Sequence, residues 1–161
     1  VLTDGITGAP VEVLERLPEN GGVVMVTFVP SFINQAVADF NGPDAEAPSA
    51  TLADVADHID HIRAVAGVEH VGIGGDYDGI STVPIGLEDV STYPALFEEL
   101  ARRGWSDDEL RLLAGENVLR VMRGAEAAAR RLQRERAPST ATIEELDGPA
   151  AGDGPAQDGA L

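Results

Sequence analysis

The sequence contains no cysteine. Disulfide bonds, thiolate metal sites and cysteine nucleophiles are therefore excluded. Lysine is absent as well: the eleven basic residues are all arginines, against 28 acidic residues, and the formal net charge is −17. Because nucleic-acid binding depends on basic side chains that neutralise phosphates, we do not expect a nucleic-acid partner.

Long apolar runs are also missing. No run approaches the roughly 20 residues needed to cross a bilayer, and no signal peptide is visible at the start. We therefore expect no membrane segment and a cytoplasmic location. The first residue is Val1 rather than methionine, which suggests a processed product or a piece of a longer protein.

Aromatic residues make up only 4% of the chain, so any core must be built mainly from aliphatic side chains. Segment 134–161 is rich in Ala, Gly, Pro and acidic residues. Such a composition buries too little apolar surface to offset the loss of chain entropy on folding. We predict that 134–161 is a disordered acidic tail.

The apolar pattern predicts a parallel β-sheet. Segments 21–30 and 68–75 are apolar runs flanked by glycine or proline, as in strands buried on both faces. Between them, 52–66 has the period of an amphipathic helix, which makes a strand–helix–strand unit. Two such strands need neighbours for burial, so we expect the chain to be part of a larger α/β body.

Local capping signals accompany the helices. Thr51 with Asp54 and Ser106 with Glu109 have the spacing of capping boxes. We place later helices at about 93–103, 107–114 and 116–133.

Two carboxylates, Asp76 and Asp78, follow the second predicted strand in the sequence VGIGGDYDG (71–79). Chemistry in α/β folds is commonly placed at the carboxyl ends of parallel strands. There a carboxylate can bind a metal, act as a base or hold an amine; alternatively, both aspartates only cap the loop. Strand alternation puts them on one side and Tyr77 on the other.

A second polar cluster lies on the predicted helix 52–66. Asp54, Asp57, His58 and His61 are three or four residues apart, a spacing that could bring metal ligands together. Because this helix connects two parallel strands and so lies outside the sheet, we favour a solvated helix face. His70 is expected to be structural.

Three segments carry a resemblance to a known family: NGGVVMVTF (20–28), LADVADHIDHIRAVAGVEHVGIGGDYDG (52–79) and the run from Gly86 to Arg123 that begins GLEDVSTYP. They resemble the C-terminal third of membrane dipeptidase (renal dipeptidase, peptidase family M19). The resemblance runs from about Val11 to Glu126, and leaves 1–10 as a divergent N-terminal segment.

The resemblance implies a partial (β/α)8 TIM barrel of the metal-dependent hydrolase type: 11–133 would supply the last two strands and the C-terminal helices. It implies a dipeptide hydrolase with two zinc ions. Asp76 would be the catalytic, substrate-binding carboxylate, and Phe32 aligns with a substrate-side tyrosine. Asp78 and Gly79 would shape the loop.

The sequence also departs from the family. The zinc ligands expected from the resemblance are absent, and the three histidines present match non-ligand positions. Thr7 stands where a substrate-carboxylate arginine is expected, and Thr27 replaces an asparagine. Changes near Thr7 and Phe32 would weaken recognition of a dipeptide carboxylate.

Two hypotheses follow. The chain is a fragment of a zinc metallo-dipeptidase that is inactive by itself, with no zinc bound in the family geometry. Alternatively, it is a non-catalytic remnant or an interaction subunit that completes a barrel with a partner chain or in a homo-oligomer.

Overall fold

The computed structural model describes residues 11–43 and 47–148. The chain divides into two compact units, 1–124 and 125–161. The first unit carries the sheet.

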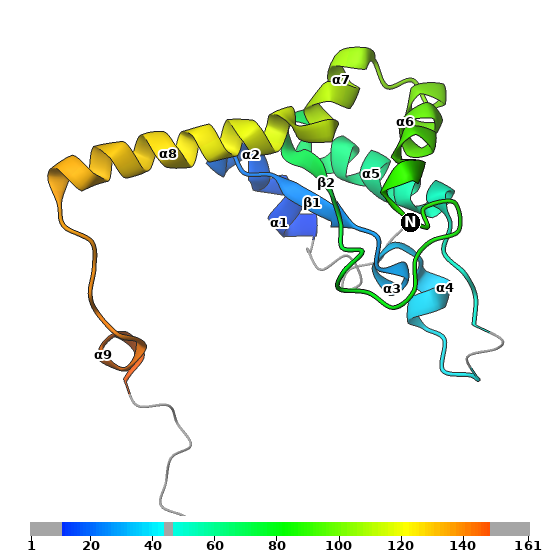
Figure 1. Cartoon of the computed structure of the whole chain (residues 1–161), viewed down its shortest axis with the longest axis horizontal. Coiled ribbons are helices and arrows are strands. Elements are labelled where there is room, and N and C mark those ends of the chain that lie inside the picture. Colours follow the sequence, from blue (N-terminus) through cyan, green and yellow to red (C-terminus); the bar gives the residue numbers. More distant parts are fainter. Residues whose placement is uncertain (1–10, 44–46, 149–161) are drawn as a thin grey trace, which may run out of the picture. The chain divides into compact units, whose positions relative to one another are not determined.

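The described residues form one sheet of two parallel strands, β1 (Val24–Thr27) and β2 (Val71–Gly75). Helix α5 (Leu52–Ala66) connects them, and the strands lie side by side in Figure 1. The register pairs Val24 with Val71 and shifts after Val26. The strand–helix–strand unit predicted from the sequence is therefore confirmed.

Both strands are shorter than the apolar runs that predicted them. The second run begins with a 3-10 turn, η2 (Val68–His70), and only then continues as β2. The imidazole Nδ1 of His70 lies 2.7 Å from the carbonyl oxygen of Gly22, in the residues before β1. This contact joins the starts of the two strands and agrees with a structural role for His70.

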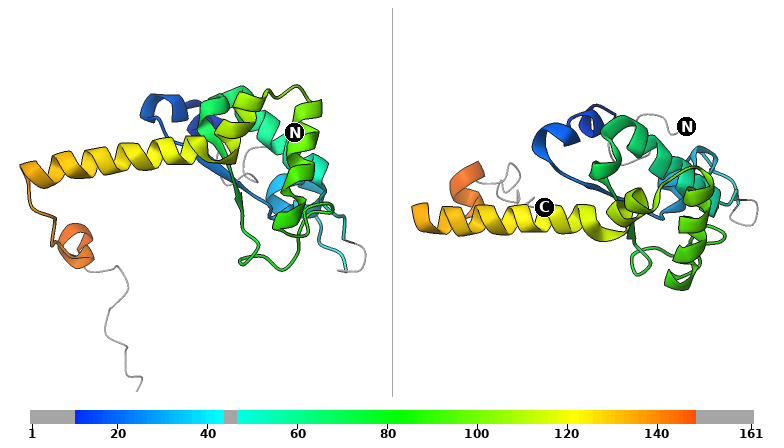
Figure 2. Two further views of the ribbon diagram at one scale, coloured as in Figure 1. Left: turned by 45° about the horizontal axis from the view of Figure 1, so that its top comes forward. Right: turned by 90° about the horizontal axis from the view of Figure 1, so that it is seen from above.

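A core of aliphatic side chains holds the first unit together. It includes the fully buried residues Phe28, Val55, Ile59, Val71, Leu87, Leu96 and Leu100. They come from β2, from α5, from the helix at 93–102, from the residue directly after β1 and from the loop that follows β2. The views in Figure 2 show α5 alongside both strands. Burial of this apolar surface is the main term that stabilises such a domain.

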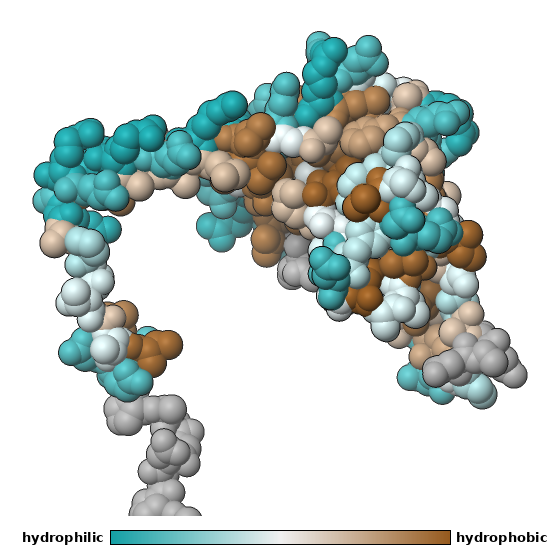
Figure 3. Space-filling view, in the orientation of Figure 1, coloured by the Kyte–Doolittle hydropathy of each residue, from teal (hydrophilic) through white to brown (hydrophobic). Residues whose placement is uncertain are grey.

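The sheet is not covered equally on its two faces by the described residues. Val26 is 2% exposed, whereas its neighbour Met25 is 37% exposed. Gly74 in β2 is exposed as well. The space-filling view in Figure 3 shows apolar side chains at the surface of this unit. The two-faced burial predicted for the strands is thus not met within the described part of the chain.

Short helices flank β1. They are α1 (Val11–Glu15), α2 (Leu17–Asn20), α3 (Pro30–Ile33) and α4 (Gln35–Ala38). The side chain of Asn34 caps α4 by accepting from the N–H groups of Ala36 and Val37. These helices were not anticipated from the sequence pattern.

After β2 come η3 (Val90–Thr92), α6 (Tyr93–Arg102), α7 (Asp107–Arg111), the π-turn η4 (Leu112–Glu116) and α8 (Asn117–Glu135). The helices are near the predicted ranges, except that α7 ends earlier because η4 intervenes. Both predicted capping boxes, at Thr51 and at Ser106, are present and confirmed.

The second unit contains the C-terminal part of α8 and the short helix α9 (Ile143–Asp147). Thr142 and Glu145 form a capping box at the start of α9. This helix lies inside the segment for which we predicted a disordered tail, and α8 also reaches into it. Residues 149–161 lie outside the described part. None of the described helices has the length and apolarity required to span a bilayer.

Candidate functional site at the end of β2

The backbone turns sharply where β2 ends. Gly75 has a φ of 73° and Asp76 a φ of 75°; Asp76 is the only described residue other than glycine with a positive φ. The N–H of Asp76 donates to Gly74 (2.9 Å), and the N–H of Gly79 donates to Asp76 (3.0 Å). A left-handed non-glycine residue costs free energy, and such residues cluster at functional sites.

Two glycines make room for this turn. A Cβ on Gly79 would overlap the carboxylate oxygen Oδ1 of Asp76. A Cβ on Gly75 would lie 2.7 Å from the hydroxyl oxygen of Tyr93, closer than real side chains approach. The carboxylate of Asp76 therefore lies over Gly79, which gives a physical reason for the loop-shaping role proposed for that glycine.

A cavity of about 490 Å³ opens at this turn. Its lining consists of Gly74, Asp76, Tyr77, Asp78, Asp89, Val90 and Tyr93. Asp76 and Asp78 thus line one cavity. Tyr77 lines it too, so the prediction that it points away is wrong: the positive φ at Asp76 ends the extended backbone on which strict alternation depends.

Aromatic packing fixes the position of Tyr77. Its ring centroid lies 5.7 Å from that of Phe28 in an edge-to-face arrangement, and 6.2 Å from that of Tyr93. Phe28 is fully buried directly after β1. Tyr77 stands between Asp76 and Asp78 in the sequence. Its ring therefore anchors the loop that carries both carboxylates to the core.

The cavity is strongly acidic. Asp76, Asp78 and Asp89 contribute three carboxylates, and all three residues are exposed. Hydrogen bonds from the side chain and backbone of Ser91 lower the pKa of Asp89. Burial raises the pKa of Tyr77, so its hydroxyl stays protonated at neutral pH. Such a lining attracts a cationic group such as an ammonium and disfavours anions.

Phe32 lies elsewhere. It is 45% exposed on α3 and lines a separate cavity of about 30 Å³ with residues of β1. The structure therefore does not bring Phe32 and Asp76 into one cavity. Thr27, at the end of β1, lines the same small cavity as Phe32. Thr7 lies outside the described residues.

Zinc needs three or four protein ligands of the His, Cys, Asp or Glu type. Among the described residues, no group of three or more such side chains has an arrangement that could hold a metal ion. The carboxylates beside Asp76 accordingly do not fit a zinc site by themselves.

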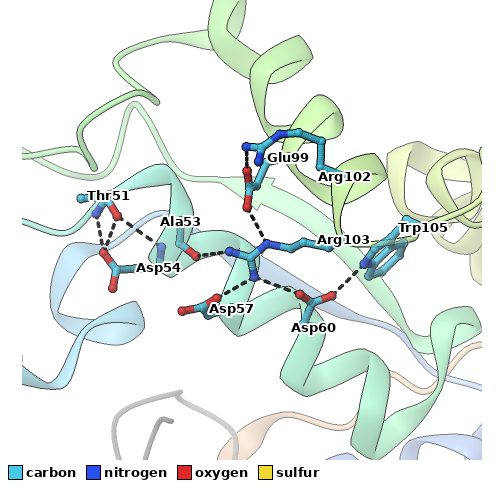
Figure 4. Close-up of polar contacts among 9 residues, drawn as sticks. All are labelled: Thr51, Ala53, Asp54, Asp57, Asp60, Glu99, Arg102, Arg103 and Trp105. Carbon is cyan, nitrogen blue, oxygen red and sulfur yellow. Dashed lines mark hydrogen bonds and ion pairs between the residues drawn. The ribbon is translucent and has the colours of Figure 1, made fainter.

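The polar cluster on α5 is only in part the solvated face that we favoured: Asp57 is exposed, whereas His58 is buried. His58 is only 5% exposed, and burial, aided by the nearby His61, lowers its pKa to about 4. Asp57 and Asp60 pair with Arg103, whose Nη1 lies 2.6 and 3.0 Å from their oxygens (Figure 4). The prediction fails for His58 because this residue lies on the side of α5 that packs toward β1 and the short helices around it.

Comparison with known proteins identifies the family. The model of membrane dipeptidase (peptidase family M19) matches residues 7–136. Dipeptidase 3 of Rattus norvegicus is 46% identical over 123 residues, which cover 76% of this chain and 23% of that protein. The chain thus spans about a quarter of the length of this curated relative.

Solved structures agree with this result. A metallopeptidase from Rhodobacter sphaeroides, bound to a phosphinate mimic of the dipeptide L-Ala-D-Ala, is 30% identical, with a TM-score of 0.55 over 66% of this chain and 28% of its own. A probable dipeptidase from Pseudomonas aeruginosa, 24% identical, has a TM-score of 0.59 over 70% and 39%, and supports the fold alone. The chain belongs to the membrane dipeptidase family, peptidase family M19.

Proposed function

We propose that this chain supplies the substrate-facing carboxylate of a dipeptide-hydrolysing metallopeptidase, and that this carboxylate is Asp76. The observation that carries the proposal is the left-handed backbone of Asp76 at the carboxyl end of β2, at the mouth of an acidic cavity. In parallel α/β folds this is the end of the strands where substrates bind.

The chemistry of the cavity fits a dipeptide with a free amino group. Its ammonium would be attracted by Asp76, Asp78 and Asp89. In this proposal Asp76 contacts the substrate and accepts or returns a proton during amide hydrolysis. Asp78, two residues further on, shapes the loop and adds negative charge.

The fold context of this site is proposed to be a (β/α)8 barrel. In that arrangement β1 and β2 are the last two strands, and α5 is the helix between them. The parallel pairing and the similarity to the Rhodobacter sphaeroides metallopeptidase support this assignment. A complete barrel needs about 200 residues or more, and the remaining strands would cover the face of the sheet at Met25.

In the complete enzyme, a pair of zinc ions would activate the attacking water. The described residues offer no ligand group for these ions, so we assign no step to a metal held by this chain. We therefore expect that the 161-residue chain does not hydrolyse dipeptides by itself. A dipeptide assay of the purified chain with added zinc tests this point, and turnover would contradict it.

A second candidate function is that of an interaction subunit that completes a barrel with another chain. The exposure of Met25 and Gly74 on one face of the sheet favours it. Light scattering of the purified chain addresses this: a stable monomer at micromolar concentration contradicts a partner-dependent module, whereas a defined oligomer supports it.

The role of Asp76 is tested by a chimera. The corresponding segment of the Rhodobacter sphaeroides metallopeptidase is replaced by residues 11–126 of this chain, and hydrolysis of L-Ala-D-Ala is measured with zinc present. We expect activity in the chimera. Asp76→Asn should then lower kcat by about 100-fold or more, because a lost proton-transfer group typically costs 10²–10⁴-fold.

Asp78→Asn in the same chimera is the matched control, since it removes an equal charge two residues away. We expect it to change kcat by less than about tenfold. The variant perturbs the loop but removes no proton-transfer group, whose loss would have a larger effect. Circular dichroism and zinc content confirm that each variant is folded and loaded. Equal activities of Asp76→Asn and the parent chimera would refute the assignment.

A further inference from the structure

A second cavity of about 490 Å³ lies between the N-terminal part of α5 and the short helices α3 and α4. Its lining comprises Ile33, Asn34, Gln35, Ala36, Asp54, Asp57, His58, Asp60 and His61. It shares no lining residue with the cavity at Asp76. Its volume is in the range typical of small-molecule sites, about 300–1,000 Å³.

His58 provides a buried polar group in this lining. The residue is 5% exposed, and its Nδ1 atom has no hydrogen-bond partner among the described residues. Buried polar groups are normally paired, because an unpaired one costs free energy. Since burial holds the pKa of His58 at about 4, the ring is neutral at pH 7 and offers one acceptor nitrogen.

The charges around His58 are unbalanced. Asp54, Asp57 and Asp60 bring three carboxylates to the cavity. Arg103 pairs with Asp57 and Asp60, and is also shared with Glu99. Asp54 has no ion-pair partner in the described part of the chain; its carboxylate accepts hydrogen bonds from Thr51 and Asn34 only.

Apolar groups complete the lining. Ile33, the last residue of α3, is buried, and Ala36 lies three residues further on in α4. Both line the cavity. An aliphatic stem could therefore contact Ile33 and Ala36, while a positively charged head reaches the carboxylates. A metal ion is a poorer match, since these side chains are not arranged as a metal-holding group among the described residues.

We propose that this cavity, lined by His58 and Asp54, is a binding site for an aliphatic primary ammonium group. The ammonium donates hydrogen bonds to the carboxylate of Asp54 and to neutral acceptors of the cavity, with its stem against Ile33. The group belongs either to a free small amine or to a lysine side chain of a peptide. The two sources present the same chemistry to the cavity.

The test is a titration of the full, isotopically labelled chain with n-butylammonium chloride, followed by NMR of the backbone amides and histidine rings. We expect saturable shifts at Asn34, Ala36, His58 and His61. n-Butanol, which has the same stem without the charge, should give none. The peptide acetyl-Gly-Lys-Gly-amide forms a second arm: binding by both ligands indicates a site open to free amines, and binding by the peptide alone indicates a lysine site.

Asp54→Asn is the matched variant, because the amide oxygen of asparagine can still accept from the N–H of Thr51, the N-cap of α5, but the charge is lost. It should weaken butylammonium binding about tenfold, the loss expected for one charge-assisted hydrogen bond. Asp78→Asn removes the same charge at the other cavity and should leave the affinity unchanged. Shifts confined to Asp76 and Asp78, equal shifts with n-butanol, or no saturation with either ligand would each overturn the proposal.

Discussion

The indole Nε1 of Trp105 donates a hydrogen bond of 2.7 Å to Oδ1 of Asp60, across 45 residues of sequence. The other oxygen of Asp60 accepts from Arg103 at 3.0 Å. One carboxylate on α5 thus receives two donors from the turn that follows α6, as Figure 4 shows. The guanidinium of Arg63 lies 4.5 Å from the centre of the indole ring. These contacts fix α6 and α7 against α5.

We predict that Trp105→Phe lowers the free energy of unfolding by about 2 kcal/mol, because it removes the donor to a half-buried carboxylate and leaves a small cavity. Trp105 is 4% exposed, so solvent cannot replace the indole without rearrangement. Urea unfolding followed by circular dichroism measures the change.

Arg102→Gln is the control for Trp105→Phe. Arg102 pairs with Glu99 but is largely exposed, and exposed ion pairs contribute about 0–1 kcal/mol. If the two variants unfold at the same urea concentration, the hydrogen bond between Trp105 and Asp60 does not stabilise the fold.

The capping boxes at Thr51 and Ser106 could be predicted from the sequence because both partners lie within one turn of helix. The parallel strands could be predicted because a buried strand needs a continuous apolar run. The contact between Trp105 and Asp60 could not, since it depends on how two helices pack. Hydrogen bonds between distant residues leave no periodic signal in the sequence.

Burial of His58 was missed for the same reason. On α5 it stands among Asp57, Asp60 and His61, and a run of polar residues is normally a solvated face. The apolar positions Val55, Ile59 and Ile62 flank it on the helix, and its exposed fraction of 5% shows that it belongs to their side. The left-handed φ of Asp76 could not be predicted from the sequence either. The glycines before it indicate a turn, but they do not indicate which residue of the turn adopts the left-handed conformation.

Asn117, at the start of α8, holds η2 and β2 in place. Its side-chain Nδ2 donates to the carbonyl oxygens of Val68 (2.7 Å) and Val71 (2.9 Å), and the residue is 1% exposed. Asn117→Ala should lower the free energy of unfolding by about 2–4 kcal/mol, since it leaves two carbonyls without this donor in a buried site.

The control for Asn117→Ala is Asn41→Ala. Asn41 also donates from Nδ2 to a backbone carbonyl, that of Asp39, but it is exposed. Water can replace that bond, so we expect a change within about 0.5 kcal/mol. Thermal unfolding monitored by tryptophan fluorescence compares the two variants. Equal midpoints would contradict the stabilising role of the two buried hydrogen bonds from Asn117.

Gly79→Ala should displace the carboxylate of Asp76, because the new Cβ would overlap Oδ1 of that aspartate. The expected result is a change in the NMR signals of Asp76 and Tyr77 while the helical circular dichroism is kept. Gly124→Ala is the control: nothing lies within 4 Å of a Cβ there, and it is inside α8. That change should stabilise the helix by up to about 1 kcal/mol and leave the Asp76 signals unmoved.

His58 should make stability depend on pH. Its pKa is about 4 in the folded chain and 6.5 in the unfolded one. The unfolded chain therefore binds a proton first as the pH falls, and the stability present above pH 6.5 is lost between about pH 6.5 and 4. The difference in pKa corresponds to about 3 kcal/mol.

The groups that face His58 bear on the size of this effect. His61 lies on the same helix and lowers the pKa further, while Asp54, Asp57 and Asp60 line the same cavity. Unperturbed carboxylates titrate near pH 4, so urea unfolding between pH 6.5 and 5.5 largely avoids their contribution. His58→Leu should flatten the curve in that interval.

NMR titration of the His58 ring in the unmodified chain measures its pKa directly. This measurement tests the burial of His58 even if the His58→Leu variant does not fold. We expect the ring to remain neutral down to about pH 5, one unit above its pKa. A midpoint near 6.5 would show that His58 is solvated in solution. In that case the buried imidazole, and with it the ammonium site proposed for its cavity, would have to be abandoned.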